Sequence, residues 1–173
     1  LGLPGSETLP TNPVYLNSLT RALETSPEQV RQIKPAAWLA FTVFNRVVKK
    51  LQTEPIEDNR IDFEDGYGNR PDDEEDSHAV SAADEVAKGM SENLLSPFIG
   101  IRVKTFSDEC KVRSIRTLDI FLTRLAEKTG GRLPQNFIVT LPKVVTPTQV
   151  STCAKILENL ESRLGFPQDS LKM

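Results

Sequence analysis

Three short segments with a strand pattern alternate with longer segments of helical pattern, and this alternation constrains the fold more than any other feature of the chain. The short segments span residues 60–65, 98–103 and 137–141. The longer segments, with apolar residues at steps of three and four, span residues 72–90, 111–128 and 147–164. Short apolar strands joined by long amphipathic helices are typical of parallel sheets covered by helices. The sequence therefore predicts an α/β fold with about three parallel strands and covering helices.

Two architectures use such units, the doubly wound open sheet and the closed (β/α)8 barrel. No Gly-x-Gly-x-x-Gly turn follows any of the three strands, so the dinucleotide-binding form of the open sheet lacks its phosphate-binding turn. Charged residues follow the strands instead: Glu64 and Asp65, then Arg102 and Lys104, then Lys143. Barrel enzymes build their sites from the carboxyl ends of several strands. We therefore predict a partial (β/α)8 TIM barrel.

The part of the chain before the first strand is predicted to be helical after an initial loop. Asn12 and Ser26 are N-cap residues, and each precedes a proline at a first helical position. Residues 36–52 carry apolar side chains with helical spacing. We expect two domains, an N-terminal loop and helical segment at residues 1–35 and a partial (β/α) barrel at residues 36–173.

The charge and cysteine content exclude several classes of partner. The chain has 21 basic and 24 acidic residues, a net charge of −3, which argues against nucleic acid because phosphate binding needs a basic face. No apolar run reaches the length of a membrane span. Cys110 and Cys153 do not form a metal-type pair, and Cys153 lies on the apolar side of a helical pattern. We expect a cytoplasmic protein without a nucleic-acid or membrane partner.

Three acids at the end of the first strand are candidates for chemistry. In a continued strand, Asp62 and Glu64 would share one face and Asp65 would point the other way. Grouped acids bind a divalent cation or act as acid and base. The alternative is a solvated strand end, because residues 72–76 show that surface acids are common in this region. The apolar strand before the acids and the Gly-Tyr-Gly turn at residues 66–68 favour a functional role.

Two cations at the other strand ends are candidates for substrate binding. Arg102 lies within an apolar strand, where an unpaired charge is costly, and its planar guanidinium suits a carboxylate. The alternative is a structural salt bridge to a residue such as Glu64. Lys143 either faces the same site, at the carboxyl ends of the strands, or is an exposed loop lysine. Lys104 and His78 are weaker candidates, and we expect His78 to be a surface residue on an acidic helix.

Three motifs occur in order on these strand ends: IDFEDG at residues 61–66, IRV at 101–103 and LPKV at 141–144. Together they resemble the HpcH/HpaI aldolase and citrate lyase β-subunit family, within the phosphoenolpyruvate/pyruvate barrel superfamily. The resemblance covers roughly residues 36–165 and is closer to one branch, in which RIDFEDGYG recurs nearly as written at residues 60–68. The GYG of this motif departs from the usual Ala-Val of the family.

The resemblance implies a (β/α)8 barrel that makes or breaks a carbon–carbon bond next to a carboxylate, on an oxo-acid or a CoA thioester. Mg²⁺ would stabilise an enolate intermediate in such an enzyme. Arg102 matches the arginine that binds the substrate carboxylate, and we group Asp62 with it. Glu64, Asp65 and Lys143 match catalytic positions. The metal-binding Glu and Asp of the family lie on later strands, so we expect no metal ligand among the present residues and expect those ligands beyond Met173.

We thus expect an internal piece of the barrel, with strands two to four of eight and no strand beginning between the last helix and Met173. Such a piece would have no lyase activity by itself, and the full-length protein would be a homo-oligomer that acts on a small-molecule carboxylate. Two alternatives stay open. One is a non-catalytic or regulatory carboxylate-binding barrel. The other is phosphotransfer to or from pyruvate on the same scaffold.

Overall fold

The computed structural model describes residue 7 and residues 11–173. The chain divides into two compact units, the first ending at Pro55 and the second spanning Ile56–Met173. We had placed the boundary near residue 36, at the start of the long N-terminal helix. The two compact units divide after Pro55, and this helix packs on the helices that precede it.

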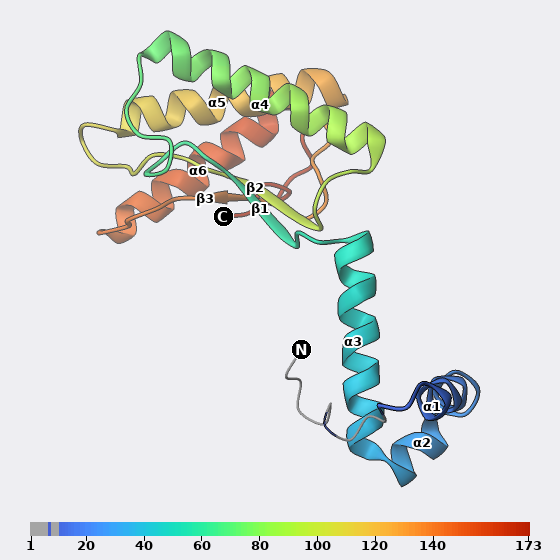
Figure 1. Ribbon diagram of the computed structural model, residues 1–173. Helices are drawn as coiled ribbons and strands as arrows, with labels where there is room; N and C mark the ends of the chain where they lie inside the picture. Colours follow the sequence, from blue (N-terminus) through green and yellow to red (C-terminus); the bar gives the residue numbers. More distant parts are fainter. Residues whose placement is uncertain (1–6, 8–10) are drawn as a thin grey trace. The chain divides into compact units, whose positions relative to one another are not determined.

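Within its described residues the first unit contains three α-helices, and each begins at a proline (Figure 1). They are α1 (Pro13–Thr25), α2 (Pro27–Ile33) and α3 (Pro35–Thr53). Proline suits the first helical position because its missing N–H would have no partner there. As predicted, Asn12 caps α1, with its side-chain oxygen accepting the Val14 N–H at 2.9 Å. The core of the unit contains Leu19, Leu23, Val30 and Ala37, with Ala22, Trp38 and Phe41 packed against it.

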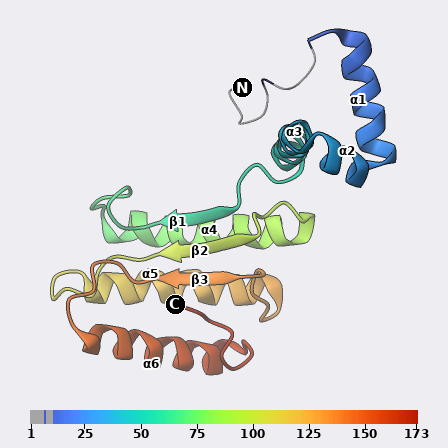
Figure 2. The same cartoon turned by 90° about the horizontal axis from the view of Figure 1, so that it is seen from below.

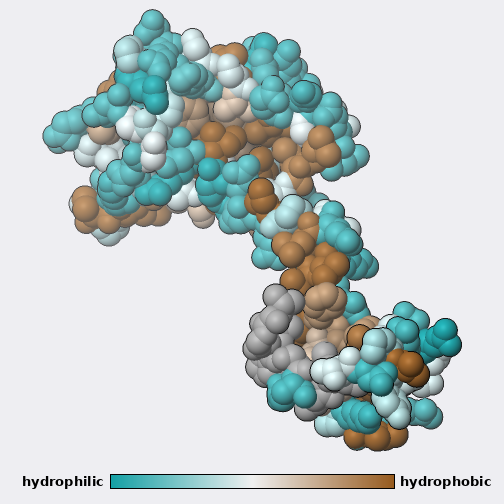
Figure 3. Space-filling view, viewed as in Figure 1, coloured by the Kyte–Doolittle hydropathy of each residue, from teal (hydrophilic) through white to brown (hydrophobic). Residues whose placement is uncertain are grey.

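Apolar side chains also gather on the surface of α3, as the space-filling view shows (Figure 3). The large exposed ones on this helix are Leu39, Phe44, Val47 and Leu51. Despite this apolar surface, none of the helices in the described part of the chain combines the length and apolarity needed to cross a membrane.

The second unit is a parallel three-stranded sheet with helices between and after the strands (Figures 1 and 2). Its elements are β1 (Asp58–Asp62), α4 (Asp72–Glu92), β2 (Phe98–Arg102), α5 (Lys111–Thr129), β3 (Phe137–Thr140) and α6 (Pro147–Leu164). The strands lie in the order β1-β2-β3, and both neighbouring pairs are parallel. The predicted α/β fold with three parallel strands and covering helices is thus confirmed.

The core lies between the sheet and these helices. The side chains of Ile99, Ile101 and Val103, at every second position, are buried on one face, and Phe137 and Val139 of β3 continue that layer. The three helices supply the other half of the core with Ala83, Leu118, Phe121, Leu122, Leu125, Cys153, Leu157 and Leu160. The predicted core position of Cys153 is confirmed, because this side chain is fully buried. Side chains between the buried ones, such as those of Arg102 and Thr140, therefore project from the opposite face.

A fourth segment begins to pair with the sheet beyond α6, which corrects our expectation that none would. Lys172 forms a parallel bridge with Ile138, and the carbonyl oxygen of Lys172 accepts the Val139 N–H at 2.8 Å. Because Ile138 already faces Gly100 of β2, Lys172 lies on the other edge of β3. Leu171, Lys172 and Met173 are too short a segment to show a strand pattern in the sequence, so only the bridge to Ile138 identifies it.

Gly100 allows a close approach between β2 and β3, and we expect Gly100→Ala to destabilise the second unit. A Cβ at this position would lie 2.0 Å from the backbone oxygen of Ile138, which cannot move without disturbing the ladder. Forced overpacking of this kind costs about 1–3 kcal/mol. Gly89→Ala is the matched control, because its Cβ would meet only the movable end of Leu95. Chemical denaturation of both variants is the measurement, and equal stability of the two would contradict the prediction.

Candidate functional site

The carboxyl ends of the three strands bring charged residues together, as the parallel sheet requires. Asp62, Arg102 and Thr140 lie side by side as the last residues of β1, β2 and β3. The loops that follow each strand carry the remaining candidates. We call Glu64, Asp65, Arg102 and Lys143 the strand-end cluster.

β1 ends earlier than predicted, and this changes where its acids point. Asp62 is the last strand residue, and its two carboxyl oxygens accept the N–H groups of Glu64 at 2.8 Å and Gly66 at 3.1 Å. Asp62 therefore shapes the turn, and a contact with substrate stays a prediction for this residue. The expected strand alternation is wrong beyond Asp62, because Glu64 and Asp65 lie in the turn and both reach Lys143.

Glu64 is the centre of the strand-end cluster. Its side chain is only 5% exposed, and its two oxygens lie 2.5 Å from Nη2 of Arg102 and 2.8 Å from Nζ of Lys143. The salt bridge that we considered as the alternative role of Arg102 is therefore present. The Arg102 side chain is 36% exposed, however, so Arg102 also keeps a surface that a ligand can contact. One buried carboxylate thus joins the loops or ends of all three strands.

Asp65 and Lys143 form the exposed side of the same cluster, with 2.7 Å between the carboxylate and the ammonium nitrogen. The hydrogen bond from Lys143 holds the pKa of Asp65 below its ordinary value of 3.8. Hydrogen bonds to Asp65 and then Glu64 raise the pKa of Lys143 above 10.5. Lys143 adopts a left-handed backbone conformation, with φ of 51°, which is uncommon outside glycine and costs energy. This strained backbone directs the lysine side chain toward the two acids.

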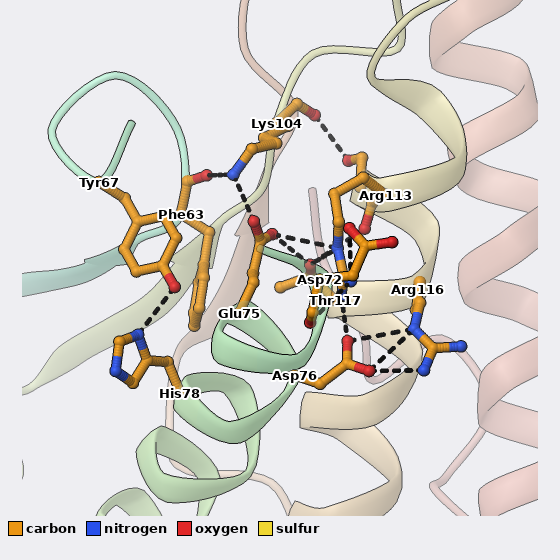
Figure 4. Close-up of polar contacts among 11 residues, drawn as sticks. Phe63, Tyr67, Asp72, Glu75, Asp76, His78, Lys104, Arg113, Arg116 and Thr117 are labelled. Carbon is orange, nitrogen blue, oxygen red and sulfur yellow. Dashed lines mark hydrogen bonds and ion pairs between the residues drawn. The ribbon is translucent and has the colours of Figure 1, made fainter. Parts of the chain in front are cut away.

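A buried polar network around Glu75 was not predicted (Figure 4). Lys104 donates to the Phe63 carbonyl at 2.8 Å and to the Glu75 carboxylate at 2.7 Å, and both side chains are almost fully buried. The second oxygen of Glu75 accepts the Thr117 hydroxyl at 2.6 Å and lies 3.4 Å from Nε of Arg113. The network therefore ties the turn after β1 to β2, α4 and α5.

Sequence reasoning missed Glu75 because it stands in a run of acids that reads as solvated surface. The one available signal is its spacing with Ala79 and Ala83, which places all three on the buried face of α4. Lys104 gave a signal too, as a charged residue directly after a buried strand, but we ranked it below Lys143.

Tyr67 covers the ammonium group of Lys104. The Lys104 nitrogen lies 4.9 Å from the centre of the Tyr67 ring, a cation–π contact, and the ring also packs on Phe63. The Tyr67 hydroxyl forms a 2.8 Å hydrogen bond with Nδ1 of His78. Burial raises the pKa of Tyr67. His78 is exposed as predicted, and it anchors the loop that carries Glu64 and Asp65.

A hollow of about 250 Å³ opens beside the cluster, and we call it the strand-end hollow. It lies between the loop after β1 and the loop after β2, with Lys143 at its side. Its lining residues are Glu64, Asp65, Gly68, Asn69, Lys104, Thr105, Cys110 and Lys143. Three predicted catalytic residues, Glu64, Asp65 and Lys143, therefore share one hollow, whereas Arg102 and Asp62 are not among its lining residues.

The cluster combines two carboxylates with two cations and is electrically balanced. Such a set can bind a carboxylate through Arg102 or Lys143 and can exchange a proton through Glu64 or Asp65. Comparison with known proteins identifies one family: a family model described as "Domain of unknown function (DUF6986)" matches residues 7–173. No curated protein and no solved structure matches the chain.

Lys104→Met is expected to destabilise the second unit strongly. The change removes the ammonium partner of a buried carboxylate and leaves one Glu75 oxygen without its donor, while the other keeps Thr117 and the more distant Arg113. Breaking a buried ion pair by removing one partner costs about 3–5 kcal/mol. Lys111→Met is the matched control, because Lys111 pairs with Asp108 on the surface, where such pairs contribute about 0–1 kcal/mol. Urea denaturation of both variants tests this, and a Lys104→Met protein as stable as the control would show that the pair is dispensable.

We also expect the ion pair of Asp65 and Lys143 to depend on pH at both extremes. The lowered pKa of Asp65 stabilises the folded state above the unfolded value near 3.8, and this contribution is lost as the pH falls through the folded pKa. The raised pKa of Lys143 stabilises the folded state below about 10.5, and this contribution is lost as the pH rises through the folded pKa.

NMR titration of the Asp65 carboxyl measures the acidic limb directly. Lys143→Met serves as the control and should raise the pKa of Asp65, because it removes the hydrogen bond that lowers it. An Asp65 pKa that stays the same in the variant would contradict the assignment of Lys143 as the cause.

Proposed function

This chain belongs to the DUF6986 family, and we propose that it forms part of a (β/α)8 barrel enzyme that cleaves or forms a carbon–carbon bond next to a carboxylate. The observation that carries the proposal is the convergence of Glu64 with Arg102 and Lys143, from the ends of three successive parallel strands. In barrel enzymes, catalytic residues come from the ends of several strands at this face. The order of the three motifs along the chain supports the resemblance to the HpcH/HpaI aldolase and citrate lyase β-subunit family.

The strand order supports a barrel over a doubly wound sheet. A doubly wound sheet reverses its strand order at a switch point, where its ligand binds. Here β1, β2 and β3 are neighbours in the order of the sequence. The segment at Lys172 pairs in parallel with β3, on the edge away from β2, so it continues the same order. The helices α4 and α5 cover one face, as in the outer ring of a barrel (Figure 2).

Arg102 is the proposed carboxylate-binding residue. Glu64 holds the guanidinium by one edge, and the partly exposed remainder can donate to a ligand carboxylate in the bidentate manner that arginine favours. The Arg102 Nε atom is buried and has no hydrogen-bond acceptor among the described residues, so the guanidinium is not saturated. Glu64 thereby acts as a positioning residue for Arg102.

The reaction we propose is cleavage of a hydroxy-substituted acid into a carbonyl compound and an enolate. A base takes the proton of the substrate hydroxyl, the carbon–carbon bond breaks, and its electron pair passes to the carbon next to the acid or thioester carbonyl. Asp65 is the exposed acid nearest to this role, and the Lys143 ammonium can balance the developing negative charge. Protonation of the enolate carbon completes the cycle.

The described residues do not fit the Mg²⁺ ion that the resemblance implies. Both oxygens of Glu64 and one oxygen of Asp65 lie at ion-pair distance from Arg102 or Lys143. Within residues 11–173 no three His, Cys, Asp or Glu side chains form a group that could hold a metal. We therefore derive no step through a metal from these residues.

One observation favours a second candidate, a barrel that binds a carboxylate without chemistry. The two acids of the cluster are already neutralised by its two cations, an arrangement that positions side chains without leaving a free base. A non-catalytic barrel would bind the same ligands through Arg102, and only turnover separates the two candidates.

Arg102→Lys tests the proposal in the full-length protein. Lysine keeps the charge but loses the planar fork, so we expect kcat/KM to fall at least about tenfold while the fold persists. Arg124→Lys is the control, because Arg124 pairs with Asp84 on the outer helices. The assay follows cleavage of malyl-CoA, citramalyl-CoA and 4-hydroxy-2-oxo acids, together with thermal stability.

Unchanged turnover in Arg102→Lys, or a large loss of stability, would assign Arg102 to the salt bridge alone. Binding of these acids without turnover of any of them would favour the non-catalytic barrel.

A further inference from the structure

The strand-end hollow contains two kinds of polar side chain, and they differ in whether the protein already satisfies them. Lys104 is saturated: its ammonium contacts the Phe63 carbonyl, the Glu75 carboxylate and the face of Tyr67. Glu64, Asp65 and Lys143 neutralise one another or Arg102. The charged lining thus offers little unmet charge to a ligand inside the hollow.

The neutral lining is different. The Asn69 amide, the Thr105 hydroxyl and the Cys110 thiol form no hydrogen bond with any side chain or backbone group in the described part of the chain. Thr105 and Cys110 are nonetheless half-buried, where a polar group benefits from a partner. An amide and a hydroxyl both donate and accept, which is the capacity needed to bind hydroxyl groups. These side chains stand next to Lys143 in the same hollow.

We propose that Asn69, Thr105 and Cys110 form a subsite for the hydroxylated chain of the substrate, so that the ligand is a polyhydroxy carboxylic acid. The inference rests on the proposed function, since Arg102 supplies the carboxylate anchor from which this chain extends. A long apolar arm would leave the amide and the hydroxyl without partners, and a second carboxylate would enter a cluster that is already balanced. A site that binds a substrate hydroxyl discriminates against an analogue that lacks it.

The two cysteines of the chain make this subsite directly measurable. Cys110 is partly exposed in the hollow, whereas Cys153 is fully buried in the core. Burial also raises the pKa of Cys153 to about 11, so its reactive thiolate is scarce. In the native protein iodoacetamide, which is small and uncharged, should therefore label Cys110 and leave Cys153 as an internal control. Mass spectrometry follows the rate at each cysteine.

The experiment compares 2,3,4-trihydroxybutanoate with butanoate, which share a carboxylate and a chain length and differ in their hydroxyl groups. We expect trihydroxybutanoate to protect Cys110 at a concentration at least about tenfold lower than butanoate requires. Thr105→Val removes one hydroxyl at nearly constant volume and should reduce this difference. Thr105→Ser should retain it, and Thr152→Val, on the exposed surface of α6, should not change it.

Equal protection by the two acids, or an unchanged difference in Thr105→Val, would overturn the subsite. NMR signals of the Arg102 guanidinium separate this failure from that of the proposed function. If both acids shift those signals without protecting Cys110, the carboxylate site stands and the subsite is wrong. If neither acid shifts the signals or protects Cys110, the carboxylate site and the subsite are both wrong.

Discussion

The buried ion pair between Lys104 and Glu75 is the interaction on which the geometry of the second unit depends. It joins the residue after β2 to the covering helix α4, and through the Phe63 carbonyl it fixes the turn after β1. Breaking a buried ion pair by removing one partner is strongly destabilising, so a substitution of either side chain alone is costly. The same contacts place Glu64, the next residue after Phe63, against Arg102 and Lys143. A structural pair in the interior thus positions the charged cluster at the surface.

The two acids of the strand-end cluster differ in burial and therefore in the role that each can have. Glu64 is enclosed and holds two cations from different strands, which suits a positioning role. Asp65 is exposed and forms an ion pair with Lys143, so it is the acid that can contact a ligand. A balanced cluster binds an added carboxylate only by giving it part of an existing ion pair. The resulting affinity depends on how well the ligand replaces those contacts. Hydrogen bonds from the ligand's hydroxyl groups to the neighbouring hollow can add to the affinity.

Local sequence signals accounted for most of the secondary structure. Proline after an N-cap residue marked the starts of α1 and α2, and glycine in the left-handed conformation marked the end of α5 at Gly130. These signals succeed because capping and backbone preference act within a few residues. The end of β1 was misplaced because Asp62 turns the chain with its own side chain, although the apolar pattern continues to Phe63.

The sequence by itself determined that strands and helices alternate, and that Glu64, Asp65, Arg102 and Lys143 lie at the carboxyl ends of the strands or just beyond them. Parallel pairing then requires those ends to meet at one edge, whatever the loops do. Only the tertiary structure decided which charges pair, because Glu64 reaches Arg102 and Lys143 across long stretches of chain. It also decided that Glu75, one acid among several in a row, is the buried one. Burial depends on which helix face packs on the sheet, and that choice is made by contacts between distant residues.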